Sequence, residues 1–209
     1  MKPMPRLFIL SVFMIGACVG TSTHGSSDTR VNELPPTGTF SILAYDSASG
    51  QWGGAVQSRV YSVGNGVLWG EAGVGMAATQ AIVDVSYGPQ ALALLRQGKS
   101  AREVVTTVWE RDPDPDTTQW TKYGRQFAVV DAKGNVAAYT GPKATTWAGD
   151  KQGTHVTAQG NILAGPGVVD SMIAAYERTP GTLAFRLVAA LEAGRPAAET
   201  SAASKAPRC

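Results

Sequence analysis

The chain has 209 residues, of which 44% are hydrophobic and 16% are charged, and its formal net charge is +2. These values are typical of a globular protein and predict one domain with a single core. A nucleic-acid surface needs clustered lysine and arginine, so we expect no nucleic-acid partner.

The only two histidines, His24 and His155, exclude a histidine metal cluster, and a hydrogen-bonded or exposed side chain is the simpler interpretation of His155. The closely spaced glycines match no phosphate or dinucleotide motif, so we expect no metal and no cofactor.

Residues 1–18 resemble a targeting signal. Lys2 and Arg6 precede the run LFILSVFMIGAC, which is too short to span a bilayer and fits the core of a signal peptide. The small residues before Cys18 resemble the lipobox of bacterial lipoproteins, in which that cysteine is lipidated. We therefore expect an extracytoplasmic protein: a periplasmic or membrane-anchored lipoprotein that meets the membrane only through its lipid. The alternative is an ordinary signal peptide and a secreted protein. Residues 19–38, rich in Ser and Thr, predict a flexible linker.

The folded part begins with extended patterns. Two period-2 runs, residues 39–46 and 51–60, flank a short Gly-containing loop and predict a hairpin. Residues 66–81 predict a third extended stretch, in which glycines mark bends. Two helices are expected next, at 89–98 between a proline and a glycine, and at 101–111 behind a capping box formed by Ser100 and Glu103.

The second half repeats this order of strands and helices. It contains a hairpin at 126–141 that turns at 132–135, a strand within 155–165, and helices at 167–178 and 183–194, the last closed by Gly194. Strands that arrive as hairpins indicate antiparallel sheets, and grouped helices indicate layers that cover them. The sequence therefore predicts an α/β (α+β) layered sandwich.

Thr39 follows Gly38 at the start of the first expected strand and is a candidate nucleophile. A threonine hydroxyl needs a base, and in a residue that begins a chain the α-amino group can serve as that base. An α-amine has a pKa of about 7.7–8.0, so a useful fraction is uncharged near neutral pH. This chemistry requires cleavage of the Gly38–Thr39 bond. The alternative is an ordinary first-strand threonine.

The span 39–194 resembles the bacterial family known as domain of unknown function 1028, which is grouped by fold with the N-terminal-nucleophile (Ntn) hydrolases. The matching segments, in order, are TFSILA, GAVQSR, VGNGVLWGEAGVGMAATQA, YGPQALALLRQGKSA, VVDAKGNVAAYTG, WAGDKQG, QGNILAGPGVVDSM and LVAALEAG. The resemblance implies a four-layer αββα sandwich of two antiparallel sheets between helices. It also supports Thr39 as the nucleophile, because family members often start almost at this residue, behind the initiator methionine.

The tail, residues 195–209, departs from the family pattern. Family members continue with a block that resembles GGD-x-RG-x-QSAAL, whereas this chain has RPAAETSAASKAPRC. Codons can be written for Glu199 to Cys209 that read GDKRGKQSAAL once a single base is added before them. We therefore expect a frameshifted tail and a sandwich that lacks its C-terminal strand, which would leave a sheet edge unpaired.

Candidate partners of Thr39 come from the matching segments. Arg59 could hold a substrate carboxylate, with Ser58 beside it, and the amides of Gln80 and Asn161 could donate to an oxyanion. For each of these residues the alternative is a structural hydrogen bond.

The leading functional hypothesis is an Ntn-type amidohydrolase that acts on a small amide or peptide-like substrate outside the cytoplasm. The alternative is a non-catalytic binding domain of the cell envelope on a lipid tether, and a third interpretation is a truncated pseudogene product. Exposed strand edges in such a sandwich are compatible with a homodimer.

Overall fold

Residues 38–203, which the computed structural model describes, form two four-stranded antiparallel sheets. The first sheet has the order β2 (Gln51–Ser58), β1 (Thr39–Asp46), β8 (Val156–Asn161) and β7 (Gly149–Gly153). The second has the order β3 (Leu68–Glu71), β4 (Gly75–Ala81), β5 (Arg125–Val130) and β6 (Val136–Thr140). The predicted antiparallel sheets are confirmed.

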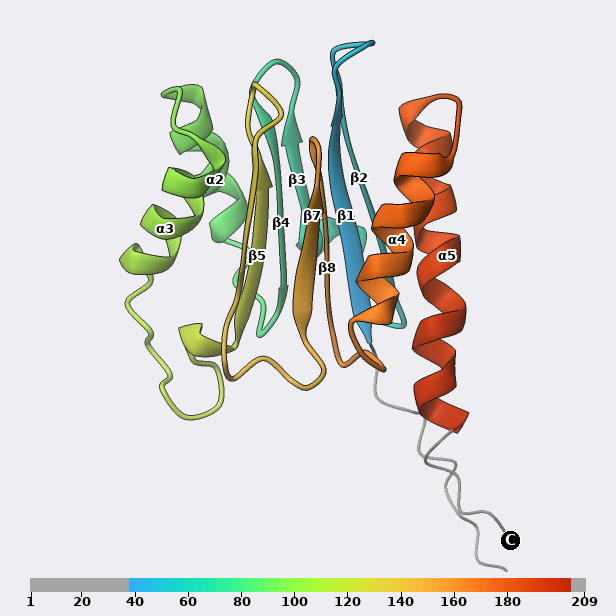
Figure 1. The fold of residues 1–209 in the computed structure, drawn as a ribbon. Helices are drawn as coiled ribbons and strands as arrows, with labels where there is room; N and C mark the ends of the chain where they lie inside the picture. The colour runs from blue at the N-terminus through green and yellow to red at the C-terminus, as the bar shows by residue number, and fades with distance from the viewer. Residues whose placement is uncertain (1–37, 204–209) are drawn as a thin grey trace, which may run out of the picture. The chain divides into compact units, whose positions relative to one another are not determined.

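Helices cover the outer face of each sheet (Figure 1). The pair α4 (Gly167–Arg178) and α5 (Leu183–Ala203) packs on the first sheet, and α2 (Tyr87–Arg96) with α3 (Ala101–Arg111) packs on the second. Two short elements, α1 (Gly64–Val67) and the 3-10 turn η1 (Lys122–Gly124), lie in connections. The four layers are those of the predicted αββα sandwich.

The alternation of side chains along each strand explains the layering. In β1, Phe40 and Ile42 are buried against α4 and α5, whereas Leu43 packs in the cluster between the sheets. In β5, Phe127 is buried against α2 and α3, and Ala128 faces the other sheet. A strand covered on both faces must place apolar side chains on both, and this is why β1 is continuously apolar at 42–44 and β5 at 127–130.

The expected capping box of α3 is present. Oγ of Ser100 accepts a hydrogen bond from the backbone N–H of Glu103 at 3.4 Å, and Oε2 of Glu103 accepts one from the backbone N–H of Ser100 at 2.9 Å. The helix before it, α2, begins at Tyr87 instead of residue 89, so the prediction for this helix was two residues late.

Three expectations for secondary structure were wrong. Residues 66–81 form two strands, β3 and β4, because Gly73 (φ 75°) and Gly75 (φ 138°) turn the chain back on itself. Strand β7, with the sequence GDKQG, was missed because a polar edge strand has no apolar alternation. The last helix continues past Gly194 to Ala203.

The reason for Gly194 is close packing within a continuing helix. A Cβ atom at this position would lie 2.9 Å from Cγ of Met172 in α4, so the glycine lets α5 approach α4 instead of ending α5.

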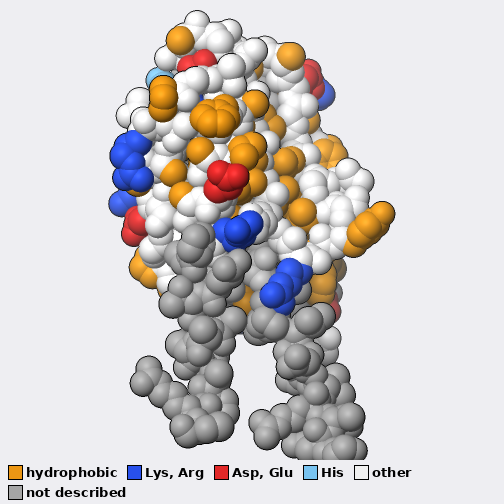
Figure 2. Space-filling view, turned by 90° about the vertical axis from the view of Figure 1, so that its right-hand side faces the viewer, with side chains coloured by type: hydrophobic (Ala, Val, Ile, Leu, Met, Phe, Trp, Pro, Cys, Tyr) orange, Lys and Arg blue, Asp and Glu red, His pale blue; other side chains and the backbone are white. Residues whose placement is uncertain are grey.

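The face formed by α4 and α5 is shown in Figure 2, where apolar side chains gather in its upper part. Phe185 and Val188 of α5 are more than half exposed, although Leu187 and Ala190 of the same helix are buried. Apolar side chains that gather on a surface are a feature of interaction sites. The homodimer remains a prediction.

The predictions for residues 1–37 and 204–209 lie outside the described residues. They include the signal peptide, Cys18, nearly all of the linker and the end of the frameshifted tail. Within residues 38–203, no helix is both long enough and apolar enough to cross a membrane.

Candidate functional site

The interior between the two sheets is apolar at one end and polar at the other. At the apolar end, Leu43 packs against Ala78 of β4 and Ala128 and Val130 of β5. Toward the start of β1, the same faces carry polar side chains that are at most 3% exposed, namely Ser41, Gln80, Gln126, Gln159 and Asn161. A buried polar group is costly unless it is hydrogen-bonded, so these side chains must satisfy one another.

A directional chain of hydrogen bonds, the amide network, joins the two sheets. Nε2 of Gln159 donates to Oγ of Ser41 at 2.6 Å, and the Ser41 hydroxyl donates to Oε1 of Gln80 at 2.7 Å. Nε2 of Gln80 then donates to Oε1 of Gln126 at 2.7 Å. The same oxygen of Gln126 accepts a hydrogen bond from Nδ2 of Asn161 at 3.2 Å. These bonds tie β1 and β8 of the first sheet to β4 and β5 of the second.

The two candidate oxyanion donors differ in their remaining capacity. Nε2 of Gln80 directs its second hydrogen at the carbonyl oxygen of Gln159, at 3.4 Å. Nδ2 of Asn161 also carries two hydrogens, and within the described part of the chain only its bond to Gln126 is present. Asn161 therefore has the greater remaining capacity to donate.

Thr39 lies at the outer end of the amide network. It pairs in register with Ser58 on one side and with Asn161 on the other, so the three side chains share one face of the sheet. Oγ1 of Thr39 lies 3.0 Å from Oγ of Ser58, a distance at which either hydroxyl can donate. Oγ of Ser58 also accepts from the backbone N–H of Val60 at 3.2 Å. The hydroxyl of Thr39 is held in a defined position by its neighbour.

A cavity of about 230 Å³, the Thr39 cavity, opens beside this hydroxyl. Thr39 and Gln80 contribute its polar lining, together with Ser62. The other described residues that line it are apolar or glycine: Val60, Tyr61, Val63, Gly66, Val67, Ala81 and Val83. The site residues that the sequence predicted, Thr39, Ser58, Gln80 and Asn161, thus gather at one end of the sandwich.

Backbone strain is concentrated around the Thr39 cavity. Ser62 (φ 55°) and Ala81 (φ 66°) line it, and Ile162 (φ 55°) directly follows Asn161. A β-branched residue rarely adopts a positive φ, so the conformation of Ile162 must be imposed by its surroundings. Strained residues of this kind cluster at ligand and active sites.

Gly38 packs closely in front of Thr39. A Cβ atom at this position would lie 2.9 Å from the carbonyl oxygen of Ile162, so a larger residue would displace the turn after β8. This close approach accounts for the glycine whether or not the Gly38–Thr39 bond is cleaved.

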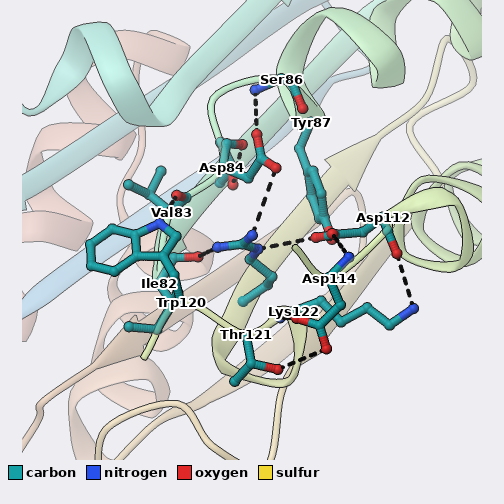
Figure 3. A network of polar contacts seen from close by, with 12 residues as sticks. Ile82, Val83, Asp84, Ser86, Tyr87, Asp112, Asp114, Trp120, Thr121 and Lys122 are labelled. Carbon is teal, nitrogen blue, oxygen red and sulfur yellow. Dashed lines mark hydrogen bonds and ion pairs between the residues drawn. The ribbon is translucent and has the colours of Figure 1, made fainter. Parts of the chain in front are cut away.

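A second polar network, centred on the buried guanidinium of Arg125, holds the loops near the same end of β4 and β5. Nε of Arg125 donates to Oδ2 of Asp112 at 3.2 Å, and Nη1 donates to the carbonyl oxygen of Ile82 at 2.9 Å. Figure 3 shows Tyr87 directed at Asp112 from α2, with the hydroxyl donating to Oδ2 at 2.8 Å. The indole of Trp120 donates to the carbonyl oxygen of Val83 at 3.3 Å, which fixes one wall of the Thr39 cavity.

The charge states in this network follow from its contacts. Burial alone would raise the pKa of the Asp112 carboxyl, but the hydrogen bonds from the Asp114 backbone, Tyr87 and Arg125 outweigh it, so the pKa is lowered. Burial and the neighbouring Asp112 carboxylate raise the pKa of the Tyr87 hydroxyl. At neutral pH the network therefore consists of a charged pair and a neutral tyrosine.

Neither Arg59 nor His155 lines the Thr39 cavity. Arg59 follows β2 on the exposed side and does not line the Thr39 cavity. His155 lies in the turn before β8, and its Nδ1 is 2.9 Å from the carbonyl oxygen of Gly134. His155 is far from Thr39 along the sheet. From Thr39 to the residue that pairs with the start of β8, strand β1 extends about 17 Å, at roughly 3.4 Å per residue. His155 is thus a hydrogen-bonded structural residue, as the sequence indicated.

A larger cavity, of about 740 Å³, lies between β2, β3 and the start of α5. Its lining is mostly glycine and apolar, and Glu71, the one charged residue among the described residues that line it, is paired with Arg96. None of the described residues that line it is a serine, threonine or cysteine. We therefore assign the candidate site to the smaller cavity, which Thr39 and Gln80 line and which lies at the end of β1 where Asn161 pairs with Thr39.

Sequence reasoning missed three members of the amide network, Ser41, Gln126 and Gln159. Each stands in a largely buried strand, on the face that is directed at the other sheet. A polar residue at an inward position of a central strand is the signal that could have identified them.

The fold and the site define an αββα sandwich in which a threonine begins an interior strand beside a buried polar network. The sequence profile of the "Family of unknown function (DUF1028)" matches residues 39–202, and the chain belongs to this family. The crystal structure of protein SPO2555 from Silicibacter pomeroyi, a DUF1028 member, is similar, with 34% identity and a TM-score of 0.71. The match covers 77% of this chain and 71% of that one. A comparison with curated proteins gave no match.

Proposed function

We propose that the protein is an Ntn-type amidohydrolase of the cell envelope whose nucleophile is Thr39. The observation that carries this proposal is the placement of the Thr39 hydroxyl. It lies 3.0 Å from Ser58, adjoins a cavity and stands beside the amide of Asn161, which has a hydrogen to donate. A nucleophile, an oxyanion donor and space for a substrate are the three elements that acyl transfer needs.

In the first step, Oγ1 of Thr39 attacks the carbonyl carbon of the amide while the α-amine of the same residue takes the hydroxyl proton. Ser58 orients Oγ1 through their hydrogen bond. The C–N bond then breaks, and the α-ammonium returns the proton to the departing amine. An ester between Thr39 and the acyl group remains.

The carbonyl oxygen becomes negatively charged during the attack and needs a donor. Nδ2 of Asn161 is held by its bond to Oε1 of Gln126, and its second hydrogen is the donor that we propose for this oxygen. A preorganised donor of this kind contributes about 10²–10³-fold to the rate of acyl transfer. Water, activated by the α-amine, then hydrolyses the ester and regenerates Thr39.

The mechanism requires maturation, because an amide nitrogen in the Gly38–Thr39 bond has no basic lone pair. In a protein anchored through Cys18, the same cut would release the domain from its lipid. The alternative function, a tethered binding domain, needs neither this cut nor the Thr39 hydroxyl. The two functions therefore differ in whether they depend on the cut before Thr39 and on the Thr39 hydroxyl.

The test uses the full-length chain with a protease site inserted directly before Thr39, so that cleavage exposes the amine. We expect the cleaved protein to hydrolyse members of an amide panel, the uncleaved protein to be inactive, Thr39→Ala to abolish activity and Thr39→Ser to retain part of it. Thr106, exposed on α3, provides the matched control Thr106→Ala, which should keep full activity. If Thr39→Ala and Thr106→Ala are equally active, Thr39 is not the nucleophile.

A further inference from the structure

The Thr39 cavity carries no charged side chain among the described residues that line it. Its apolar wall includes Val60, Val63, Val67 and Val83. The nearby carboxylate of Asp84 is engaged, because Oδ1 accepts from the backbone N–H of Ser86 at 2.9 Å and Oδ2 lies 3.7 Å from Arg125. A charged group placed in this cavity would lose its hydration without gaining a partner from the wall.

The size of the cavity limits what it can hold. At about 30 Å³ for each small group in a liquid, a volume of about 230 Å³ accommodates roughly seven non-hydrogen atoms. This is below the range of pockets that bury a whole drug-sized ligand, about 300–1,000 Å³. The cavity therefore fits one half of an amide substrate and not all of it.

The mouth of the cavity is apolar as well. Val60 is 54% exposed and Tyr61 is 97% exposed, and both line the cavity. Trp120, 51% exposed, is joined to the neighbouring wall through its hydrogen bond to the Val83 carbonyl. An apolar ligand would cover part of this exposed surface and gain from its removal from water.

We propose that the Thr39 cavity binds the acyl half of the substrate and selects a small, uncharged, apolar acyl group of roughly four to seven carbon atoms. This inference rests on the proposed function of Thr39. The acyl half stays attached to Oγ1 until water releases it, whereas the amine leaves after the first step. A cavity that adjoins Oγ1 therefore serves the acyl group in both steps.

The experiment measures kcat/KM of the cleaved full-length protein with 4-nitroanilides that differ only in the acyl group. The panel contains acetyl, butanoyl, hexanoyl and decanoyl groups, the cationic 5-aminopentanoyl group and the anionic glutaryl group. We expect about a fourfold gain per methylene up to hexanoyl, which corresponds to ~0.8 kcal/mol for each buried CH₂, and no further gain for decanoyl. The two charged groups should react at least about 100-fold more slowly than hexanoyl.

A pair of variants tests the cavity itself. Val60→Asp places a carboxylate at the mouth of the cavity, and Val85→Asp places one on a valine of similar exposure, 52%, that does not line it. Val60→Asp should lower kcat/KM for the hexanoyl substrate about tenfold or more and raise it for 5-aminopentanoyl, whereas Val85→Asp should change neither. Both valines are more than half exposed, so neither substitution threatens the fold.

Calorimetric binding of hexanamide and of 5-aminopentanamide to the uncleaved protein separates the two proposals. In one outcome no anilide is cleaved, but hexanamide binds more tightly than 5-aminopentanamide and Val60→Asp weakens the binding of hexanamide. The Ntn mechanism is then wrong and the cavity assignment is supported. If glutaryl or 5-aminopentanoyl anilide is the preferred substrate, the acyl assignment is overturned while the Ntn function is supported. A glutaryl preference that is lost in Arg59→Gln would assign recognition to Arg59 instead. If neither amide binds and no anilide is cleaved, both proposals fail.

Discussion

Replacement of Gln126 by methionine should destabilise the protein strongly, because this side chain is the junction of the amide network. Its Oε1 accepts from Gln80 and from Asn161, and its Nε2 donates to the carbonyl oxygen of Gly160 at 2.8 Å. Methionine fills a similar volume but can do neither. Two buried N–H donors are then left without an acceptor, at about 1–3 kcal/mol each, so we expect a loss of about 4 kcal/mol in the free energy of unfolding.

The assay is urea unfolding of the full-length chain, followed by tryptophan fluorescence and circular dichroism to confirm a single transition. With a slope of about 2 kcal/mol per molar urea, the midpoint should fall by about 2 M. Gln97, exposed at the end of α2, gives the matched control Gln97→Met, which should change stability by no more than about 0.5 kcal/mol. Equal midpoints for the two variants would refute the energetic importance of the amide network.

Three further predictions follow from other parts of the chain. Arg125→Met should lower stability at pH 7 by about 3–5 kcal/mol, because it leaves the buried Asp112 carboxylate unpaired. In the wild type the pKa of Asp112 is lowered on folding, so its contribution is complete above the ordinary value of 3.8 and is lost as the pH falls below it. The penalty of Arg125→Met should therefore shrink in acid unfolding titrations, and a penalty independent of pH would contradict the pairing. Labelled fatty acid should enter the protein, and Cys18→Ser should abolish this incorporation; unchanged labelling would exclude the lipoprotein. Resequencing should reveal either an in-frame continuation that encodes a GDKRGKQSAAL-like strand or a natural single-base lesion before the codon for Glu199. Restoring the frame should raise the melting temperature, whereas an unchanged melting temperature would refute the missing strand.

Most of the strands and helices were predictable because their formation depends on local sequence patterns. Alternation in β1 and β2, the capping box at Ser100 and the hairpin between β5 and β6 all have a direct local cause. Strand β7 was not predictable in this way, because its pairing with β8 and its place at the sheet edge supply what its polar sequence lacks. Gly194 meets a close approach of α4 instead of ending α5, and this contact between helices is not contained in any local pattern.

The candidate site was predictable only in part. Thr39, Ser58 and Asn161 meet because of strand register, and register is set by pairing partners far apart in the sequence. The partners of Gln80 come from both sheets, so its network could not be read from the sequence around it. Arg59 follows Ser58 directly in the sequence, yet it does not line the Thr39 cavity.

The most direct test of the central claim is intact mass and N-terminal sequencing of the protein as it matures from its full-length gene. The Ntn mechanism requires a free amine on Thr39, since only that group supplies the base for its hydroxyl. We predict that the active fraction begins at Thr39 and that its rate rises with pH through the α-amine pKa, about 7.7–8.0, as the amine loses its proton. An active protein that always begins upstream of Thr39 would contradict the Ntn mechanism and leave the tethered binding domain as the better account.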